Sequence, residues 1–296
     1  MSLSRAARVG LLTCLTLLTS AWTVAKGGGG GGPPADPAIV FVELGGKNTK
    51  LSVMNADGAK KTVIYSTSAL LRAPCWSASG DSVCFGIQVA GGAGLAVLDV
   101  DVVSGTPVGS NFMLLASGNS TNAAWSPDGA TIAFSNDAYP GIWSIPATGG
   151  TPTQLLARAD FGHGLAWSPD GSQIAFIGPP HSGSIEVLDI AGGSTFTVCT
   201  ISDDPVQVDW GRTGNTLVFH ASAASGNGKY IYTVDAAAGA VPVLVTSSSW
   251  FPTWSPDDSK IAYTTGSGDG IVVRDMQTGK ETSTGGKGRF ANWRRF

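Results

Sequence analysis

The residues best able to form a binding site stand four positions ahead of a tryptophan that recurs along the chain. Their types differ at each recurrence, in the order Arg72, Thr121, His163, Val206, Trp250 and Arg289. Arginine binds carboxylates through paired hydrogen bonds, and aromatic side chains supply the apolar area typical of binding hot spots. Phe251 and Asp204 stand close by. Around a concave surface, these side chains would bind a carboxylate-bearing ligand or an acidic peptide segment. The alternative is that residues at loop ends vary because nothing constrains them.

Patterns for catalysis or metal binding are scarce. The three histidines, His163, His181 and His220, fall in different repeats, and none has the spacing of a metal-ligand pair. No serine stands in a Gly-x-Ser-x-Gly elbow. His220 ends an apolar run, where a hydrogen-bonded strand residue is expected. We therefore expect no catalytic residue, no metal and no cofactor.

Two cysteines hold matched positions in one repeat only. Cys75 precedes Trp76 by one residue and Cys84 follows it by eight, whereas the same pair of positions elsewhere carries mostly alanine. A tight turn between them would place the two cysteines opposite each other, within reach of a cross-strand disulfide. The alternative is a pair of buried thiols in alanine-sized sites. Cys199, on an outer strand, would be left without a disulfide partner.

The elements that position these residues are copies of one hairpin, seen in "AAWSPDGATIAF", "LAWSPDGSQIAF" and "PTWSPDDSKIAY". In the turn, Pro sets φ, Asp bonds back to the backbone and Gly accepts a positive φ. The tryptophan of this hairpin recurs at Trp76, Trp125, Trp167, Trp210, Trp254 and Trp293, with spacings of 49, 42, 43, 44 and 39 residues. A large apolar side chain at one register in every unit belongs to the core rather than to a site. Strand-rich units of about 40–45 residues are typical of a β-propeller with one four-stranded blade per unit.

The two ends of the repeat array determine the number of blades. Residues 38–43, 50–55 and 61–66 match the second, third and fourth strands of a unit that lacks its first strand. The last unit supplies only a first strand, which contains Trp293. Pairing this strand with the N-terminal unit leaves no open sheet edge. The sequence therefore predicts an all-β, six-bladed propeller of four-stranded antiparallel blades over residues 38–296, closed by the C-terminal strand.

Composition and the N-terminal segment indicate where the protein acts. Only 13% of the 296 residues are charged and the net charge is −3, which argues against a nucleic-acid partner. Arg5 and Arg8 precede an apolar run that ends at Ala25, which predicts a secretory signal peptide over residues 1–25. An uncleaved membrane anchor is the alternative, and lipid anchoring is disfavoured because Lys26 stands where the modified cysteine would be. Residues 26–37 are rich in glycine and proline and predict a linker.

The motif "WSPDGxxIAF", followed by an outer turn similar to "DxxGG", resembles the repeat of TolB-type propellers, bacterial relatives of WD-repeat blades. The resemblance covers residues 38–296 and implies the propeller fold without implying one function. TolB carries an additional α/β domain ahead of its propeller, for which this sequence shows no counterpart. We therefore do not expect a role in the Tol-Pal system.

These observations predict an exported, non-enzymatic propeller, periplasmic or secreted, that acts as a monomeric interaction module in the bacterial cell envelope. The expected partner is a protein or peptide of the envelope, and a membrane would be met only through the N-terminal segment. One alternative is a glycan bound by Trp250 and nearby phenylalanines. The other is an enzyme of the lyase or lactonase type at the channel mouth, which would need carboxylates or histidines that converge on the axis.

Overall fold

The computed structural model describes residues 38–45, 47–89, 92–118, 120–136, 139–158, 164–223, 228–266 and 270–294. The regular elements in this part of the chain are all β-strands. No helix within the described ranges has the length and hydrophobicity of a membrane span. The predicted signal peptide (1–25) and linker (26–37) lie outside the described residues and stay predictions.

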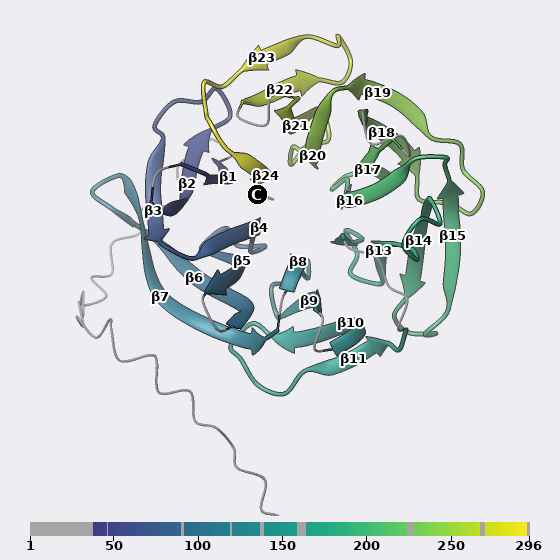
Figure 1. Ribbon diagram of the computed structural model, residues 1–296, viewed down its shortest axis with the longest axis horizontal. Helices are drawn as coiled ribbons and strands as arrows, with labels where there is room; N and C mark the ends of the chain where they lie inside the picture. Colours follow the sequence, from purple (N-terminus) through teal and green to yellow (C-terminus); the bar gives the residue numbers. More distant parts are fainter. Residues whose placement is uncertain are drawn as a thin grey trace, which may run out of the picture. The chain divides into compact units, whose positions relative to one another are not determined.

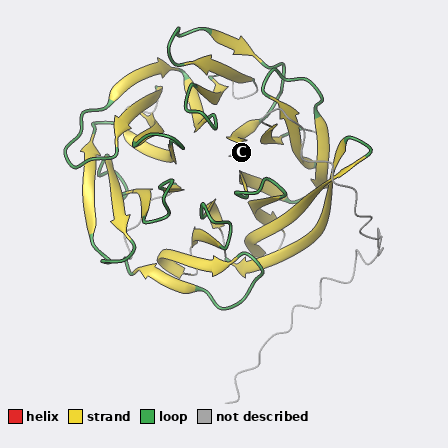
Figure 2. Cartoon of the chain, turned by 180° about the vertical axis from the view of Figure 1, so that it is seen from behind, coloured by secondary structure: helices red, strands yellow, loops and turns green. Residues whose placement is uncertain are grey.

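The described strands form six four-stranded antiparallel sheets around a central axis (Figure 1), which confirms the predicted fold class. We call these sheets blades 1 to 6 in chain order. In Figure 1 the strands β4, β8, β16, β20 and β24 lie nearest the axis, and β3, β7, β11, β15, β19 and β23 lie at the periphery. Figure 2, seen from behind, shows short loops joining the strands.

The strand bounds follow the repeat, because each innermost strand ends at a repeated tryptophan. From the inside outwards, blade 1 consists of β24 (Arg289–Trp293), β1 (Ala38–Glu43), β2 (Thr49–Asn55) and β3 (Thr62–Thr67). Blade 2 consists of β4 (Leu70–Trp76), β5 (Ser82–Val89), β6 (Gly92–Val103) and β7 (Thr106–Ser117). Blade 3 consists of β8 (Ser120–Trp125), β9 (Thr131–Asn136), β10 (Tyr139–Pro146) and β11 (Thr153–Leu156). Blade 4 consists of β12 (Leu165–Trp167), β13 (Gln173–Ile177), β14 (Ser184–Asp189) and β15 (Thr195–Thr200). Blade 5 consists of β16 (Asp204–Trp210), β17 (Thr216–Ser222), β18 (Lys229–Asp235) and β19 (Val243–Ser247). Blade 6 consists of β20 (Ser249–Trp254), β21 (Lys260–Thr265), β22 (Ile271–Asp275) and β23 (Glu281–Ser283).

The ring closes through the C-terminal strand, as predicted. β1 pairs with β2 on one side and with β24 on the other, where Ile39 lies opposite Trp293 and Val40 opposite Asn292. Blade 1 is therefore assembled from both ends of the described chain. This pairing removes the unsatisfied backbone edge that β1 would otherwise expose along the central channel.

Apolar packing between neighbouring blades holds the ring together. Each repeated tryptophan is buried and packs into the blade before it; Trp125, for example, lies in one cluster with Leu95 and Val97 of blade 2. Trp254 packs in the same way with Val218 and Ile231 of blade 5. Burial of one such side chain removes roughly 150–250 Å² from water, so the tryptophans stabilise the junctions between blades.

The "SPDG" turns are stabilised by their own side chains. In blade 3 the Ser126 hydroxyl donates to Asp128 Oδ1 (2.5 Å), and the Ala130 N–H donates to the same oxygen (3.0 Å). The Thr131 N–H donates to Ser126 Oγ (3.0 Å). Gly129 has φ 71°, a conformation that favours glycine. Each residue of the motif thus satisfies a specific requirement of the turn.

Blade 5 obtains the missing carboxylate of its turn from blade 6. Its turn contains Arg212, Thr213 and Gly214 and has no aspartate of its own. Asp258, which stands where other turns have glycine and has φ 55°, accepts the N–H groups of these residues at 2.7, 2.7 and 3.0 Å. The second aspartate of "SPDD" therefore links two blades.

Candidate functional site at the channel mouth

Three innermost strands, β4, β20 and β24, contain a β-bulge just before the repeated tryptophan, near the mouth of the central channel. In β20 the residues Phe251 and Pro252 together oppose one residue of β21, and β4 and β24 have the same irregularity. The first bulged residue is left-handed in each case: Ala73 has φ 41°, Phe251 φ 55° and Phe290 φ 57°. Such a backbone costs a non-glycine residue about 1–2 kcal/mol, and the bulge turns the side chain in a new direction.

The bulges bring aromatic side chains from different blades together. We call Trp250, Phe251, Phe290, Arg289 and His220 the mouth cluster. The Phe251 and Phe290 rings lie 4.2 Å apart between centroids, and the Arg289 guanidinium lies over the Trp250 ring at 5.5 Å. Trp250 meets Phe251 edge to face at 6.2 Å, and His220 meets Phe251 edge to face at 5.0 Å. Blades 5, 6 and 1 therefore share one aromatic surface with a cation on it.

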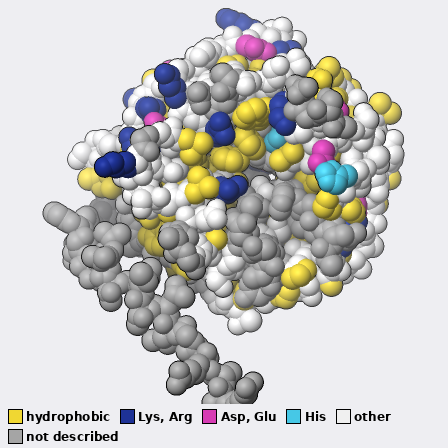
Figure 3. All heavy atoms as spheres, in the orientation of Figure 1, with side chains coloured by type: hydrophobic (Ala, Val, Ile, Leu, Met, Phe, Trp, Pro, Cys, Tyr) yellow, Lys and Arg dark blue, Asp and Glu magenta, His cyan; other side chains and the backbone are white. Residues whose placement is uncertain are grey.

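The mouth cluster is partly open to solvent. Trp250, Phe251, Arg289 and Phe290 are all half-buried. On this face, hydrophobic side chains gather beside the central hollow with Lys and Arg side chains among them (Figure 3). Half-buried aromatic side chains can lose further surface on binding, and a guanidinium group is suited to binding a carboxylate. The cluster can thus bind an apolar group and an anionic group side by side.

His220 serves as a neutral hydrogen-bond acceptor within the cluster. The Phe251 N–H donates to its Nδ1 at 3.4 Å, and the side chain is buried. Burial, reinforced by the nearby charge of Lys229, lowers the pKa of His220 to about 3. The imidazole is therefore uncharged at neutral pH and contributes to holding the left-handed backbone of Phe251.

The other predicted site residues are placed separately. Arg72 is half-buried in β4, opposite Gly86, and its Nε has no hydrogen-bond partner among the described residues. Asp204 is engaged by His181, whose Nδ1 lies 3.5 Å from a carboxylate oxygen. His163 lies outside the described residues. Of the six residues predicted at the mouth, Trp250, Phe251 and Arg289 form one cluster.

Below the mouth the channel is narrow. A cavity of about 30 Å³ is lined by innermost-strand residues, with Asn122, Gln207, Asp209 and Asn292 as its polar side chains. This cavity admits about two water molecules, so it is too small to hold an organic ligand itself.

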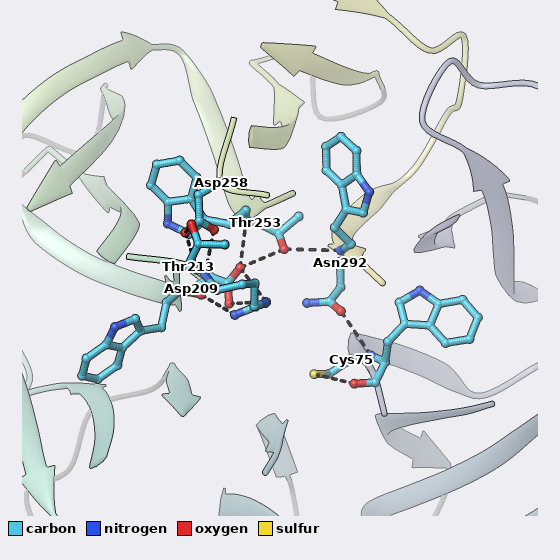
Figure 4. Close-up of polar contacts among 11 residues, drawn as sticks. Cys75, Asp209, Thr213, Thr253, Asp258 and Asn292 are labelled. Atoms are coloured by element: carbon cyan, nitrogen blue, oxygen red, sulfur yellow. Dashed lines mark hydrogen bonds and ion pairs between the residues drawn. The ribbon is translucent and has the colours of Figure 1, made fainter. Parts of the chain in front are cut away.

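Polar side chains next to the tryptophans of three blades join four consecutive blades, 5, 6, 1 and 2 (Figure 4). The Asp209 carboxylate accepts hydrogen bonds from the Thr253 hydroxyl and the Trp254 N–H, both at 2.9 Å. Thr253 Oγ1 in turn accepts the Trp293 N–H at 3.3 Å. Asn292 Oδ1 continues the series into blade 2, where it accepts a backbone N–H at 3.1 Å.

The sequence interpretation missed this polar series, although a signal for it was present. The residues just before the six tryptophans are Cys75, Ala124, Ala166, Asp209, Thr253 and Asn292, and the last three in this order are polar. Buried polar groups need hydrogen-bond partners, so three in a row predict contacts between blades. At two other junctions between blades the hydrogen bond comes from the tryptophan itself: the Trp125 and Trp167 indole N–H groups donate to the backbone carbonyls of Cys75 and Ala124 at 3.1 and 3.0 Å.

Comparison with known proteins identifies the family. Residues 35–284 match the family described as the TolB beta propeller domain. The chain belongs to this family. A search of curated proteins found no match.

Solved structures with the same fold differ in what they do. TolB from Acinetobacter baumannii has a TM-score of 0.68 at 16% identity over 87% of this chain, which spans 66% of that protein's length. A chain of the nidogen/laminin complex has a TM-score of 0.68 at 10% identity, covering 87% of this chain and 98% of that one. A protein from Bacteroides uniformis assigned as a 6-phosphogluconolactonase has a TM-score of 0.55 at 15% identity, covering 86% and 98%. At these identities the likeness establishes the fold alone.

Cys75 and Cys84 lie directly opposite each other in this TolB-type propeller, within the pairing of β4 with β5. Both side chains are buried, and the Cys75 Sγ donates to the Trp76 carbonyl at 3.6 Å. This register suits a cross-strand disulfide. The disulfide itself stays a prediction. No group of three His, Cys, Asp or Glu side chains suited to a metal occurs among the described residues.

Proposed function

We propose that this TolB-type propeller is an exported, non-enzymatic interaction module of the bacterial cell envelope. The mouth cluster carries the proposal. It combines half-buried aromatic side chains with an arginine, and it is assembled from three blades at the entrance of the central channel. The basic and apolar pattern of residues 1–25 supports export. A propeller found in the nidogen/laminin complex gives support at the level of the fold.

The partner would present a carboxylate beside an apolar side chain. Arg289 would bind the carboxylate, and Trp250, Phe251 and Phe290 would bury the apolar group. Arg72 and His163 are proposed to extend the same surface, with Asp204 at its margin. A segment of an envelope protein fits this chemistry, because a polypeptide offers both groups within a few residues.

The enzyme alternative receives less support from the mouth. The histidine of the mouth cluster, His220, is neutral, buried and bound to the backbone, and the exposed His181 contacts Asp204 at the margin. A lactonase-like or lyase-like site would instead need titratable groups free to reach a substrate. A glycan-binding function shares the aromatic surface, and it differs from peptide binding because it does not need two arginines.

Site-directed photo-crosslinking in envelope extract tests the proposal. A photoreactive amino acid replaces Lys287, an exposed residue next to β24, and the control places it at Val241, an exposed residue of the opposite face. We expect a discrete adduct from position 287 only, and we expect Arg72→Ala with Arg289→Ala to abolish it. An adduct that persists in the double variant, or that forms equally from Val241, would refute the mouth as the interaction site.

Export is tested separately by the mass of the mature protein. Cleavage after Ala21 or Ala25 is expected, and the processed chain should be recovered outside the cytoplasm. An intact N-terminus in the cytoplasmic fraction would contradict this part of the proposal without affecting the mouth.

A further inference from the structure

A cleft between blades 2 and 3 lies on the face of the propeller opposite the mouth. It has a volume of about 700 Å³, within the range of about 300–1,000 Å³ common for ligand sites. It is formed by the turn between β4 and β5, by β6 and β7, and by the two turns of blade 3 on this face. Its lining includes two carboxylates, Asp81 and Asp99, and no Lys, Arg or His.

The two carboxylates converge on one hydroxyl group. Ser82 Oγ lies 3.0 Å from Asp99 Oδ1 and 3.3 Å from Asp81 Oδ1, so these oxygens are at most about 6 Å apart. Both groups are held in place by neutral donors, since Asn111 Nδ2 donates to Asp99 at 3.0 Å and the Ser77 hydroxyl donates to Asp81 at 3.1 Å. The cleft therefore presents two oriented carboxylates with neutral neighbours.

The negative charge in the cleft is only partly compensated. The pKa of Asp81 lies below its usual value, because hydrogen bonds from Ser79, Ser77 and Ser82 outweigh burial, which alone would raise it. Asp81 attracts Arg294, whose Nη2 donates to the Ser79 carbonyl and which does not line the cleft. Asp99 forms no ion pair with a Lys or Arg among the described residues. Two like charges this close repel each other unless a cation lies between them.

Apart from the carboxylates, the wall combines Ser, Asn and Thr side chains with apolar side chains. Met113, Ala147 and Phe112 line the cleft, together with the largely buried Val97 and Trp125. A neutral carbohydrate could stack on Phe112, which is 41% exposed and has one ring face against Tyr65 at 5.5 Å, but it would leave both carboxylate charges uncompensated. A lone metal ion would leave most of the volume and the apolar wall unused. A cation on an aliphatic stem matches both the charge and the wall.

We propose that this cleft binds an organic cation, an ammonium or guanidinium group carried on an aliphatic stem. The group would lie between Asp81 and Asp99, and the stem would lie along Met113 and Ala147. Such a group occurs on a free polyamine and on a lysine or arginine of a partner protein. The site is independent of the mouth, because it lies on the opposite face and shares no residue with it.

Calorimetric titration of the full chain at low salt tests the proposal with defined probes. One arm uses spermidine, and the other uses a short neutral peptide with a single lysine, matched to a norleucine peptide. Asp99→Asn removes the charge at the same shape, and Asp101→Asn, on the same strand but outside the cleft, is the control. We expect saturable binding of at least one cationic probe that weakens about tenfold in Asp99→Asn and is retained in Asp101→Asn.

The outcomes distinguish the ligand source and can overturn the idea. Saturable binding of spermidine alone points to a free polyamine, and binding of the lysine peptide but not the norleucine peptide points to a partner side chain. Saturation by neither cation refutes the site. Equal weakening in both variants also refutes it, because the effect then reflects general surface charge. Thermal unfolding of each variant confirms that it is folded before titration.

Discussion

Replacing Asp258 with glycine should destabilise the propeller, although it relieves an unfavourable backbone conformation. Asp258 has φ 55° at a position where Gly129 has φ 71° and Gly171 has φ 73°. Glycine at position 258 would restore the motif of blade 3 and remove a cost of about 1 kcal/mol. On local grounds alone, the substitution would therefore stabilise the protein.

The contacts of Asp258 with blade 5 reverse that expectation. Its carboxylate accepts the partly buried Arg212 N–H at 2.7 Å, and a hydrogen bond to a charged group contributes about 1.5–3 kcal/mol when it is shielded from water. The bonds to Thr213 and Gly214 are exposed, so water can replace them and they add about 0.5 kcal/mol each. Subtracting the relieved strain leaves a net loss of about 1–3 kcal/mol.

Denaturant unfolding of the full chain measures this difference. We expect a lower midpoint for Asp258→Gly at an unchanged m-value, which shows that the surface exposed on unfolding is the same. Asp258→Asn keeps one acceptor oxygen and tolerates the left-handed conformation, so its unfolding midpoint should lie between those of the parent and Asp258→Gly. Gly129→Asp is the reverse control and should destabilise by about 1 kcal/mol, because it adds strain. If Asp258→Gly is as stable as the parent, the link between blades has no energetic value.

Three further predictions concern the scaffold. If Cys75 and Cys84 form a disulfide in the exported protein, its mass is two hydrogens lower than that of the thiol form. Reducing the disulfide should then lower the free energy of unfolding by about 2–3 kcal/mol, the value for so short a loop. Thiol titration of the denatured chain that finds only reduced cysteines would contradict this. Thr253→Val removes a hydroxyl that both donates and accepts between blades, so it should destabilise by about 1–3 kcal/mol, whereas Thr62→Val on an outer strand should have little effect. The hydrogen bond from the Ser255 hydroxyl, which outweighs burial, lowers the pKa of Asp257 to about 2. The stabilisation that the Asp257 carboxylate gives to the folded protein is therefore complete above the usual aspartate pKa near 4, and it is lost as the pH falls towards 2. Asp257→Asn should therefore flatten the decline of stability in acid. Parallel pH profiles of stability for the parent and the variant would contradict this.

The fold could be predicted because its determinants are local and repeated. A tryptophan followed by a Pro-Asp-Gly turn indicates one hairpin, and the spacing of about 40 residues gives the blade. The incomplete unit before Trp76 and the lone strand around Trp293 together predict the closure. Each of these signals lies within one unit, so no knowledge of contacts between blades is needed.

The candidate site was only partly predictable, because it depends on contacts between blades. The heterogeneous positions ahead of the tryptophans include Trp250 and Arg289, which the structure brings together with Phe251; their role in binding stays a prediction. His220 is a hydrogen-bonded strand residue, as expected, but its partner could not be foreseen, because that partner is a backbone N–H in another blade. Asp204 was predicted at the binding surface, but its contact with His181 depends on how two loops of neighbouring blades approach each other.

The mouth cluster and the polar series occupy the same part of the ring, and the physical demands of the cluster explain why. Phe251 and Phe290 sit in left-handed conformations, which persist only where surrounding contacts fix the backbone. Two residues further along the same strands, Thr253 and Asn292 make the hydrogen bonds that join blades 6, 1 and 2. His220 holds the Phe251 N–H from the other side. The deviations from the repeat thus support one another: the polar residues below the mouth stabilise the strained aromatic residues within it, and a preformed surface loses less conformational entropy on binding.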